Sequence, residues 1–420
     1  MPPHLCISGG RRLEGEVRAS GSKNATLPMM AAAILADGLV LLAGAPQVAD
    51  VGWMARVLGE LGVEVLFDED ETLQIRVVDP RPVHARYKLV RRMRASFCVL
   101  GPLVARRGEA VVSLPGGCAI GPRPIDLHLA GLAALGAEIT LRHGYVVAKA
   151  PRLRGATIDL AGPHGPTVTG TVNVLSAAVL AEGQTTLHHA AVEPEVVELG
   201  QMLTAMGAKI NGLGSPTICI EGVAHLGGAT VRVIPDRIEA ATLLMAGAIT
   251  RGTVRVTGIV PEHLTAVLDL LGRTGCRLDV ADDAVTIHSE NRPHAVDVTA
   301  EPYPGVPTDV QAQWMALLSL AEGTSTVRDT VFPTRMAHVA ELIRLGARID
   351  QHDGTAVIHG VPKLSGAVVT ARDLRASAAL VLAGLAAEGT TTVRAVHHLD
   401  RGYQRLDRKL AALGATIERR

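Results

Sequence analysis

Residues 410–417 read LAALGATI, and residues 132–139 read almost the same, LAALGAEI. Both stretches have the form of a helix end, a glycine and the start of a strand. Four further copies follow the same form, at LGELGVEV (58–65), LTAMGAKI (203–210), LGRTGCRL (271–278) and LIRLGARI (342–349). The six glycines, which are 68 to 74 residues apart, are Gly62, Gly136, Gly207, Gly275, Gly346 and Gly414. A repeat of this kind indicates six copies of one supersecondary unit.

A second glycine pattern repeats in phase with the first. It follows an apolar helical run and precedes a β-rich run, and we expect its glycines to form left-handed helix C-caps: Gly38, Gly108, Gly183, Gly252, Gly323 and Gly389. Each unit therefore alternates helices with short strands, which predicts an α/β fold. Because 420 residues exceed one ordinary core, we expect two domains of three units, divided near residue 231.

Composition excludes several classes of protein. The 41 basic and 41 acidic residues cancel, and aromatic residues make up 2% of the chain, so neither nucleic acid nor an anionic membrane is an expected partner. The five cysteines show no CxxC pairing, which argues against a disulfide framework and against a metal site. The first residues lack the apolar core of a signal peptide, and no uncharged apolar run reaches about 18 residues. We expect a soluble, cytoplasmic protein.

Polar residues collect at the starts of the helices that precede the second glycine pattern. These starts are SGSKNATLP (20–28), VRRMRASFC (90–98), TGTVNVLSA (169–177), IPDRIEAAT (234–242), VPTDVQAQW (306–314) and ARDLRASAA (371–379). Acidic residues there are ordinary caps, but basic residues are unfavourable in a first turn and require a negative group nearby. We expect a site for a small anion carrying phosphate and carboxylate groups, lined by Lys23, Arg94, Arg123, Arg335, Arg375 and Arg401, with Asn24, Asp236, Asp309 and Asp373 beside them.

A thiol in a glycine-rich loop is the second candidate feature. Cys118 lies in VSLPGGCAIGPRPID (112–126), five residues before Arg123, and a positive neighbour lowers the pKa of a thiol. The alternative is a small loop residue with no role. A cysteine nucleophile would require a histidine base, and His128 lies two residues into the next helical run, so a hydrolase is disfavoured. No phosphate-binding loop or dinucleotide fingerprint occurs.

These motifs together resemble a known family. SGSKNATLP, MRAS (93–96), LPGGCAIGPRPIDLH (114–128), VPTDVQAQ (306–313), DLRASAALVLAG (373–384) and HLDRGY (398–403) are similar to those of the UDP-N-acetylglucosamine enolpyruvyltransferases. The resemblance covers the whole chain. It implies two inside-out α/β domains of three βαβαββ repeats each, with the active site in the interdomain cleft. The N-terminal domain would comprise 22–231, and the C-terminal domain 1–21 with 232–420. The loop at 112–126 would be a lid.

The resemblance also implies a chemistry and a set of roles. Phosphoenolpyruvate gives its enolpyruvyl group to a hydroxyl of a uridine nucleotide, and no metal or organic cofactor takes part. Cys118 would be the general acid and the residue that fosfomycin alkylates, and Asp309 would be the base. Phosphoenolpyruvate would contact Lys23, Arg123, Arg335, Arg375 and Arg401. The nucleotide would contact Asn24, Arg94, Arg123, Pro124, Ile125, Asp126, Leu127, Thr167, Val168, Thr169, Asp309 and Val331. Asp373 and Asp236 would be further cleft residues.

Two segments depart from the family pattern. HGPTVTGTVN (164–173) replaces a loop that usually reads SVGAT, and VFPTR (331–335) has Pro333 where the family has glutamate. Both fall where the nucleotide would bind, so a paralogue acting on UMP or another uridine nucleotide in nucleoside-antibiotic synthesis is the alternative. An RNA 3′-phosphate cyclase and a non-catalytic sensor are disfavoured, because the transferase motifs and the basic residues are present.

Overall fold

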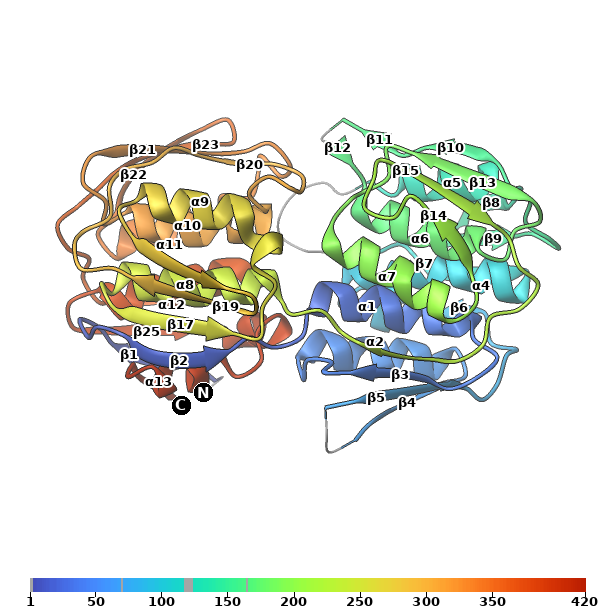
Figure 1. Ribbon diagram of the computed structural model, residues 1–420, viewed down its shortest axis with the longest axis horizontal. Coiled ribbons are helices and arrows are strands. Elements are labelled where there is room, and N and C mark those ends of the chain that lie inside the picture. The colour runs from blue at the N-terminus through green and yellow to red at the C-terminus, as the bar shows by residue number, and fades with distance from the viewer. Residues whose placement is uncertain (1–2, 69–70, 117–123, 164) are drawn as a thin grey trace. The chain divides into compact units, whose positions relative to one another are not determined.

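The computed structural model describes residues 3–68, 71–116, 124–163 and 165–420 (Figure 1). Its described residues form two compact units. The N-terminal unit comprises residues 21–116 and 124–234, and the C-terminal unit comprises residues 3–20 and 235–420. Each unit has its own hydrophobic core.

The N-terminal unit contains three four-stranded sheets in the part of the chain that is described. Their strand orders are β16-β3-β5-β4, β6-β7-β9-β8 and β10-β13-β15-β14. The strands of the first sheet are Ala229–Arg232 (β16), Val40–Ala43 (β3), Leu73–Val77 (β5) and Val63–Phe67 (β4). Those of the second are His84–Ala85 (β6), Glu109–Ser113 (β7), Tyr145–Lys149 (β9) and Glu138–Arg142 (β8). Those of the third are Thr157–Asp159 (β10), Gln184–His188 (β13), Thr217–Glu221 (β15) and Lys209–Asn211 (β14), with a short pair at Ala161–Gly162 (β11) and Gly165–Pro166 (β12).

The C-terminal unit repeats this plan, with strand orders β18-β19-β17-β2, β20-β21-β23-β22 and β24-β25-β1-β26. The first sheet contains Arg277–Ala281 (β18), Ala284–His288 (β19), Thr253–Thr257 (β17) and Glu14–Arg18 (β2). The second contains Val298–Ala300 (β20), Thr324–Asp329 (β21), Thr355–His359 (β23) and Arg348–His352 (β22). The third contains Val368–Thr370 (β24), Thr390–Arg394 (β25), Leu5–Ser8 (β1) and Thr416–Arg419 (β26). Because β1 pairs with β26, the two chain ends lie side by side (Figure 1).

Two helices accompany each sheet. In the N-terminal unit they are Lys23–Ala32 (α1), Ala49–Glu60 (α2), Leu100–Arg107 (α4), Asp126–Ala134 (α5), Val168–Ala178 (α6) and Pro194–Ala205 (α7), with short turns at Ala33–Leu35 (η1), Tyr87–Val90 (α3) and Arg94–Val99 (η2). In the C-terminal unit they are Arg237–Ile249 (α8), Thr265–Arg273 (α9), Gln311–Leu318 (α10), Val339–Arg344 (α11), Leu374–Ala386 (α12) and Leu406–Ala412 (α13), with short 3₁₀ turns at Pro261–Leu264 (η3), Thr308–Val310 (η4) and Val396–Arg401 (η5).

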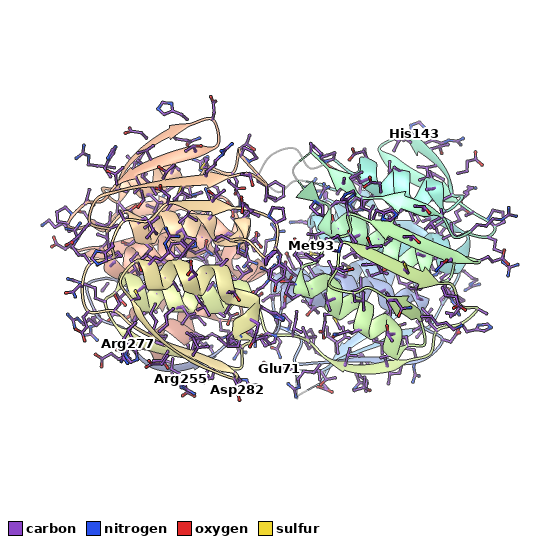
Figure 2. The ribbon with its side chains drawn as sticks, turned by 45° about the horizontal axis from the view of Figure 1, so that its top comes forward. Glu71, Met93, His143, Arg255, Arg277 and Asp282 are labelled. Atoms are coloured by element: carbon purple, nitrogen blue, oxygen red, sulfur yellow. The ribbon has the colours of Figure 1, made fainter. Side chains whose placement is uncertain are left out.

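The first helix of each repeat is largely buried, which places it inside the sheets, although residues 105–107 at the end of α4 are half-buried. All 13 residues of α8 are buried, and in α1 only Asn24 is not. A helix that is apolar all round belongs to a core. The outer strands instead carry charged side chains such as Arg255 and Arg277 (Figure 2). The fold expected from the sequence, with helices inside and sheets outside in two sets of three repeats, is therefore confirmed.

The glycine patterns have two different physical causes. All six glycines of the first pattern have a positive φ, between +71° and +110°, where each helix turns into a strand. In the second pattern the expectation of left-handed helix caps holds for Gly108 alone. Gly183, Gly323 and Gly389 have a positive φ but lie beyond the caps of their helices, and Gly38 and Gly252 do not have a positive φ. A Cβ on Gly252 would lie 2.0 Å from the carbonyl oxygen of Leu13, and one on Gly38 would lie 2.9 Å from the amide nitrogen of Gly228. These two glycines allow close approach of another backbone.

No helix in the described part of the chain is both long and apolar enough to cross a bilayer.

Candidate active site

The central residues of the cysteine loop, Cys118 and Arg123, lie outside the described residues, but both flanks of the loop are visible. A Cβ on Gly116 would lie 2.4 Å from the Cα of Arg91, so this position accepts only glycine. On the other side, the Arg94 guanidinium donates a 2.8 Å hydrogen bond to the carbonyl oxygen of Pro124. Residues 91–94 therefore contact the chain on both sides of the loop.

Lys23 is the first residue of α1, and Ser22 caps this helix. A cation in a first turn opposes the helix dipole and needs a compensating charge. The compensating group is Asp50, in the first turn of α2, whose Oδ2 lies 3.3 Å from the Lys23 Nζ. Both side chains are buried. The sequence predicted a negative group near Lys23 but did not identify Asp50, because an acidic residue in a first turn is common.

Two of the segments predicted to contact the nucleotide, residues 124–127 and 167–169, lie together in the N-terminal unit. Pro124 and Ile125 lead into α5, which begins at Asp126, and Leu127 lies beside Gly162 of β11. His128, one residue further on, lies with its Nε2 3.2 Å from the Thr169 Oγ1.

The first turn of α6 is organised by local hydrogen bonds. Thr167 caps the helix by accepting from the Gly170 amide at 3.2 Å, and Val168 is its first residue. Asn173, one turn later, donates to the carbonyl oxygen of Phe97, accepts from the amide of Gly101, and lies 2.8 Å from the Nδ1 of His128. The threonines that depart from the family pattern thus serve in a capped helix start joined to α5.

In the C-terminal unit, one carboxylate is held by two guanidinium groups. The Oδ1 of Asp309, in η4, accepts from the Arg335 Nη1 at 2.9 Å. Its Oδ2 accepts from the Arg375 Nε at 3.1 Å. Both arginines are almost completely buried, whereas Asp309 is 27% exposed. The structure therefore brings together the three residues that the sequence placed at two helix starts and in a separate loop.

Burial and charge act in opposite directions on these arginines. Burial alone would lower the pKa of Arg335, but the carboxylates of Asp309 and Asp373 raise it above its ordinary value. The pKa of Arg375 is also raised, because the attraction of Asp309 and of the Tyr403 side chain outweighs burial. Both groups therefore remain cationic at all physiological pH values.

Two predicted aspartates are helix caps. Asp373 accepts from the amides of Arg375 and Ala376 at 2.8 and 3.0 Å, and its Oδ1 also lies 3.7 Å from the Arg335 Nη2. Asp236 caps α8 in the same way. Asp373 therefore places a second carboxylate near Arg335, one of the two arginines that bind Asp309.

The segment around Val331 is fixed by an aspartate that the sequence did not single out. The Oδ1 of Asp329 accepts from the amides of Val331 and Phe332, and its Oδ2 accepts from the Thr308 hydroxyl at 2.6 Å. The carbonyl oxygen of Thr308 in turn accepts from Arg335 at 3.1 Å. Asp329 thus connects the turn at Val331 with the residue before Asp309.

Pro333, the second departure from the family pattern, fits its turn. The carbonyl oxygen of Phe332 accepts from the Arg335 amide at 2.9 Å, so Pro333 occupies the second position of a β-turn. Proline is favoured there because its fixed φ matches the turn.

The last predicted basic residue is Arg401, which ends η5. The pKa of His398 is lowered mainly by burial, and the charge of Arg401 contributes to this shift.

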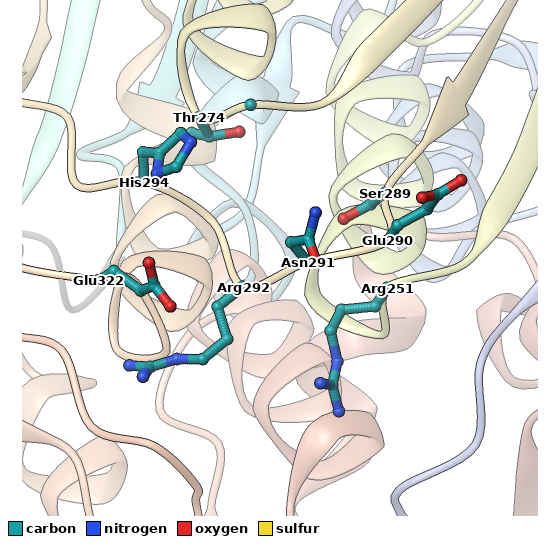
Figure 3. Close-up of a pocket in the computed structure, with 9 residues that line it drawn as sticks. Arg251, Thr274, Ser289, Glu290, Asn291, Arg292, His294 and Glu322 are labelled. Carbon is teal, nitrogen blue, oxygen red and sulfur yellow. The ribbon is translucent and has the colours of Figure 1, made fainter.

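A separate pocket in the C-terminal unit, of about 400 Å³, contains none of the predicted residues (Figure 3). Arg251, Arg292, His294 and Glu322 line part of it. The Arg292 guanidinium donates to three main-chain carbonyl oxygens, of Leu320, Ala321 and Val361. Arg292 therefore binds main-chain groups that follow α10 and β23.

What the two sets of groups can do follows from their charges. Asp309, Arg335 and Arg375 combine a base with two planar cations that match a carboxylate. Lys23 adds an ammonium group at a helix N-terminus, which suits a phosphate.

Known proteins are similar to this chain over nearly its full length. A sequence model of the EPSP synthase (3-phosphoshikimate 1-carboxyvinyltransferase) family matches residues 7–410. The chain is 54% identical over 419 residues to a UDP-N-acetylglucosamine 1-carboxyvinyltransferase of an Anaeromyxobacter species, covering 99% of both chains. It is 50% identical over 420 residues to the enzyme of that name from Akkermansia muciniphila, covering 99% of this chain and 98% of the relative.

Among solved structures, the enolpyruvyl transferase NikO from Streptomyces tendae superposes with a TM-score of 0.90 at 32% identity, covering 99% of this chain and 98% of that one. These matches confirm the resemblance that the motifs indicated. The chain therefore belongs to the EPSP synthase (3-phosphoshikimate 1-carboxyvinyltransferase) family.

Proposed function

We propose that this enzyme transfers the carboxyvinyl group of phosphoenolpyruvate to the 3-hydroxyl of UDP-N-acetylglucosamine and releases phosphate. One observation carries the choice of acceptor: relatives with that name are 50 to 54% identical over essentially the whole chain. NikO is 32% identical over the same length. The reaction would be the first step of peptidoglycan precursor synthesis, in the cytoplasm.

The proposed chemistry is an addition followed by an elimination. The acceptor hydroxyl adds to C2 of phosphoenolpyruvate as its proton passes to a base, and C3 takes a proton from an acid. The tetrahedral adduct then loses a proton from C3 and the phosphate from C2, which leaves the vinyl ether. The reaction needs one acid, one base, and cations for a carboxylate and a phosphate.

The C-terminal unit supplies the proposed base and carboxylate contacts. Asp309, which pairs with Arg335 and Arg375, is the carboxylate proposed to accept the hydroxyl proton. The Arg375 Nη1 and Nη2 atoms are buried and make no hydrogen bond of good geometry to the described residues, although Nη2 lies 3.0 Å from the Asp309 Oδ2. A buried cation with N–H groups left over is suited to a substrate carboxylate.

The N-terminal unit supplies the proposed acid and phosphate contacts. Cys118 would give the proton to C3, and Lys23, Arg123 and Arg401 would surround the phosphate. Lys23 is pre-positioned for this role by its ion pair with Asp50. Thr167, Val168 and Thr169, with the segment from Pro124 to Leu127, would hold the nucleotide.

A second acceptor is favoured by one observation. The segment at 164–173 and Pro333 depart from the family pattern at positions proposed to contact the nucleotide. Their local structure is well formed, with a capped helix and a proline-stabilised turn. A uridine nucleotide without the N-acetylglucosamine group, such as UMP, is therefore the alternative acceptor.

A phosphate-release assay tests both acceptors. The purified enzyme is mixed with phosphoenolpyruvate and, in separate reactions, UDP-N-acetylglucosamine, UMP or no acceptor. The proposal predicts rapid release with the sugar nucleotide and background release in the other two. Release with UMP alone would favour the alternative, and release with neither would refute enolpyruvyl transfer to these nucleotides.

A further inference from the structure

A buried group of hydroxyl and amide side chains lies behind Asp309 and Arg375 in the C-terminal unit. Its centre is Tyr403, whose ring is 2% exposed. The Tyr403 hydroxyl lies 3.0 Å from the Thr242 Oγ1 and 3.1 Å from the Gln313 Nε2. Thr242 lies in α8, Gln313 in α10 and Tyr403 just after η5, so the group joins all three repeats of the unit.

The protons in this group can be assigned from their neighbours. The Thr242 hydroxyl lies 2.8 Å from the carbonyl oxygen of Ile238, to which it must donate because a carbonyl only accepts. The Tyr403 hydroxyl therefore donates to Thr242. The Gln313 Nε2, which carries two protons, lies 3.1 Å from each of three acceptors: the Tyr403 hydroxyl, the Thr242 Oγ1 and the carbonyl oxygen of Asp309. The phenol proton thus points to α8, and the hydroxyl is anchored between α8 and α10.

Arg375 lies against this phenol. Its guanidinium carbon is 5.1 Å from the centre of the Tyr403 ring, a distance typical of a cation–π contact. The neighbouring residue Gly402 leaves room for it, because a Cβ there would lie only 3.3 Å from the Arg375 Nη1. With the Arg375 Nε bound to Asp309, the guanidinium plane is fixed on two sides.

We infer that Tyr403 is a positioning residue for Arg375: its hydroxyl, bound to Thr242 and Gln313, fixes the ring against which the guanidinium lies, so that the guanidinium is oriented toward a substrate carboxylate. The inference rests on the proposed function, which it deepens by assigning a role to a residue that touches neither substrate. A phenylalanine would fill the same space without burying a hydroxyl, and a buried hydroxyl costs free energy unless it is paired. The paired hydroxyl is explained if it orients the adjacent cation.

Steady-state kinetics of four enzymes tests this inference: wild type, Tyr403→Phe, Arg375→Lys and the double variant. The concentration of phosphoenolpyruvate is varied at saturating UDP-N-acetylglucosamine. In a second series the concentration of UDP-N-acetylglucosamine is varied at saturating phosphoenolpyruvate. Tyr403→Phe should raise the KM for phosphoenolpyruvate about tenfold, because loss of the hydroxyl releases the ring from Thr242 and Gln313 and so loosens the surface against which Arg375 lies. Its kcat and its KM for the nucleotide should change less than about twofold, because a carboxylate contact acts equally on bound substrate and transition state.

The double variant separates positioning from packing. If Tyr403 acts through Arg375, Tyr403→Phe should cause no further loss of kcat/KM in the Arg375→Lys background. Ser319→Ala is the matched control, since it removes a buried hydroxyl of the same unit that bonds only to the carbonyl oxygen of Met315 among the described residues. It should leave every kinetic constant unchanged.

The outcomes are distinct. An unchanged KM for phosphoenolpyruvate in Tyr403→Phe, or multiplied losses in the double variant, would overturn the inference while the proposed function stands. An inactive wild type would overturn the proposed function and this inference with it. If Tyr403→Phe does not fold, Thr242→Val removes the acceptor of the phenol proton, together with the Thr242 bonds to Ile238 and Gln313, and should raise the same KM.

Discussion

Asp309 is the residue on which the proposed chemistry most depends, because it is the carboxylate that both arginines contact. We expect Asp309→Ala to lower kcat by about a thousandfold, within the range that general base catalysis contributes. The measurement is phosphate release at saturating substrates, with circular dichroism to confirm folding. Asp282→Asn, an exposed carboxylate on a hairpin turn of the same unit, is the control and should be fully active. A loss of less than tenfold in Asp309→Ala would place the base elsewhere.

Cys118 is tested at the same scale by changing its chemistry and keeping its size. Cys118→Asp should remain active, because a carboxyl group can supply a proton, and should no longer be labelled by fosfomycin, because it is a poor target for alkylation. Intact-mass spectrometry after exposure to fosfomycin measures the labelling. Cys98→Ser, a change at a buried cysteine of the same unit, should leave labelling intact. If Cys118→Asp is still labelled, fosfomycin reacts at another residue, and the assignment of Cys118 as the general acid is contradicted.

Single residues also mark the limit of sequence reasoning. Three charged residues stood out because charged groups at helix starts need partners: Lys23, Arg375 and Asp309. Arg335 stood out because it lies in a motif that resembles the family pattern. Asp50 and Tyr403 carried no such signal, since an acid in a first turn and a tyrosine near the end of the chain are both ordinary. Their importance depends on distances of 3.3 Å and 5.1 Å to residues far away in the sequence. Such proximity follows from the packing of repeats and not from spacing along the chain.

At the scale of elements, α1 and α2 act together through their first turns. Asp50→Asn keeps the shape of the side chain but leaves the buried Lys23 ammonium without its counter-charge, which is strongly unfavourable. We expect the KM for phosphoenolpyruvate to rise about tenfold and the free energy of unfolding to fall by about 3 kcal/mol. Glu60→Gln, at the other end of α2, breaks only an exposed pair with Arg86 and should do neither. Equal effects of the two changes would contradict a special role for Asp50.

The repeat pattern predicted the elements well where the glycine is required for one reason, a positive φ. The six glycines that precede strands all have a positive φ, as a turn from helix to strand requires. Gly38 and Gly252 were misjudged because the same residue serves close backbone contact elsewhere, and only the packed structure distinguishes the two uses. The outer sheets could be predicted as strands, but the pairing of β1 with β25 and β26 joins residues more than 380 positions apart, which no local pattern contains.

For the whole molecule, the two units should differ in how their stability depends on pH. Burial lowers the pKa of His338, in the C-terminal unit, to about 4. The unfolded chain therefore binds more protons between about pH 4 and 6.5, and stability rises with pH through that range, by roughly 3 kcal/mol in all. In the N-terminal unit, burial raises the pKa of Glu198 to about 7. There the folded state binds more protons, so stability falls by about 1 kcal/mol as pH rises from 4.5 to 7.

The two tryptophans allow each unit to be followed separately, since Trp53 lies in the N-terminal unit and Trp314 in the C-terminal unit. Urea unfolding is monitored by fluorescence in Trp53→Phe and Trp314→Phe backgrounds between pH 4.5 and 8. His338→Gln should flatten the pH dependence reported by Trp314, and Glu198→Gln should flatten the one reported by Trp53. Slopes of the same sign in both units, or slopes unaffected by these changes, would contradict the assignments.

The central claim is that the enzyme places a carboxyvinyl group on UDP-N-acetylglucosamine, and a competition experiment tests it most directly. Equal concentrations of UDP-N-acetylglucosamine and UMP are incubated together with limiting phosphoenolpyruvate and the enzyme, and the nucleotides are analysed by mass spectrometry. The account predicts that the sugar nucleotide gains one carboxyvinyl group while UMP is recovered unchanged. A carboxyvinyl group on UMP, or on neither nucleotide, would contradict it.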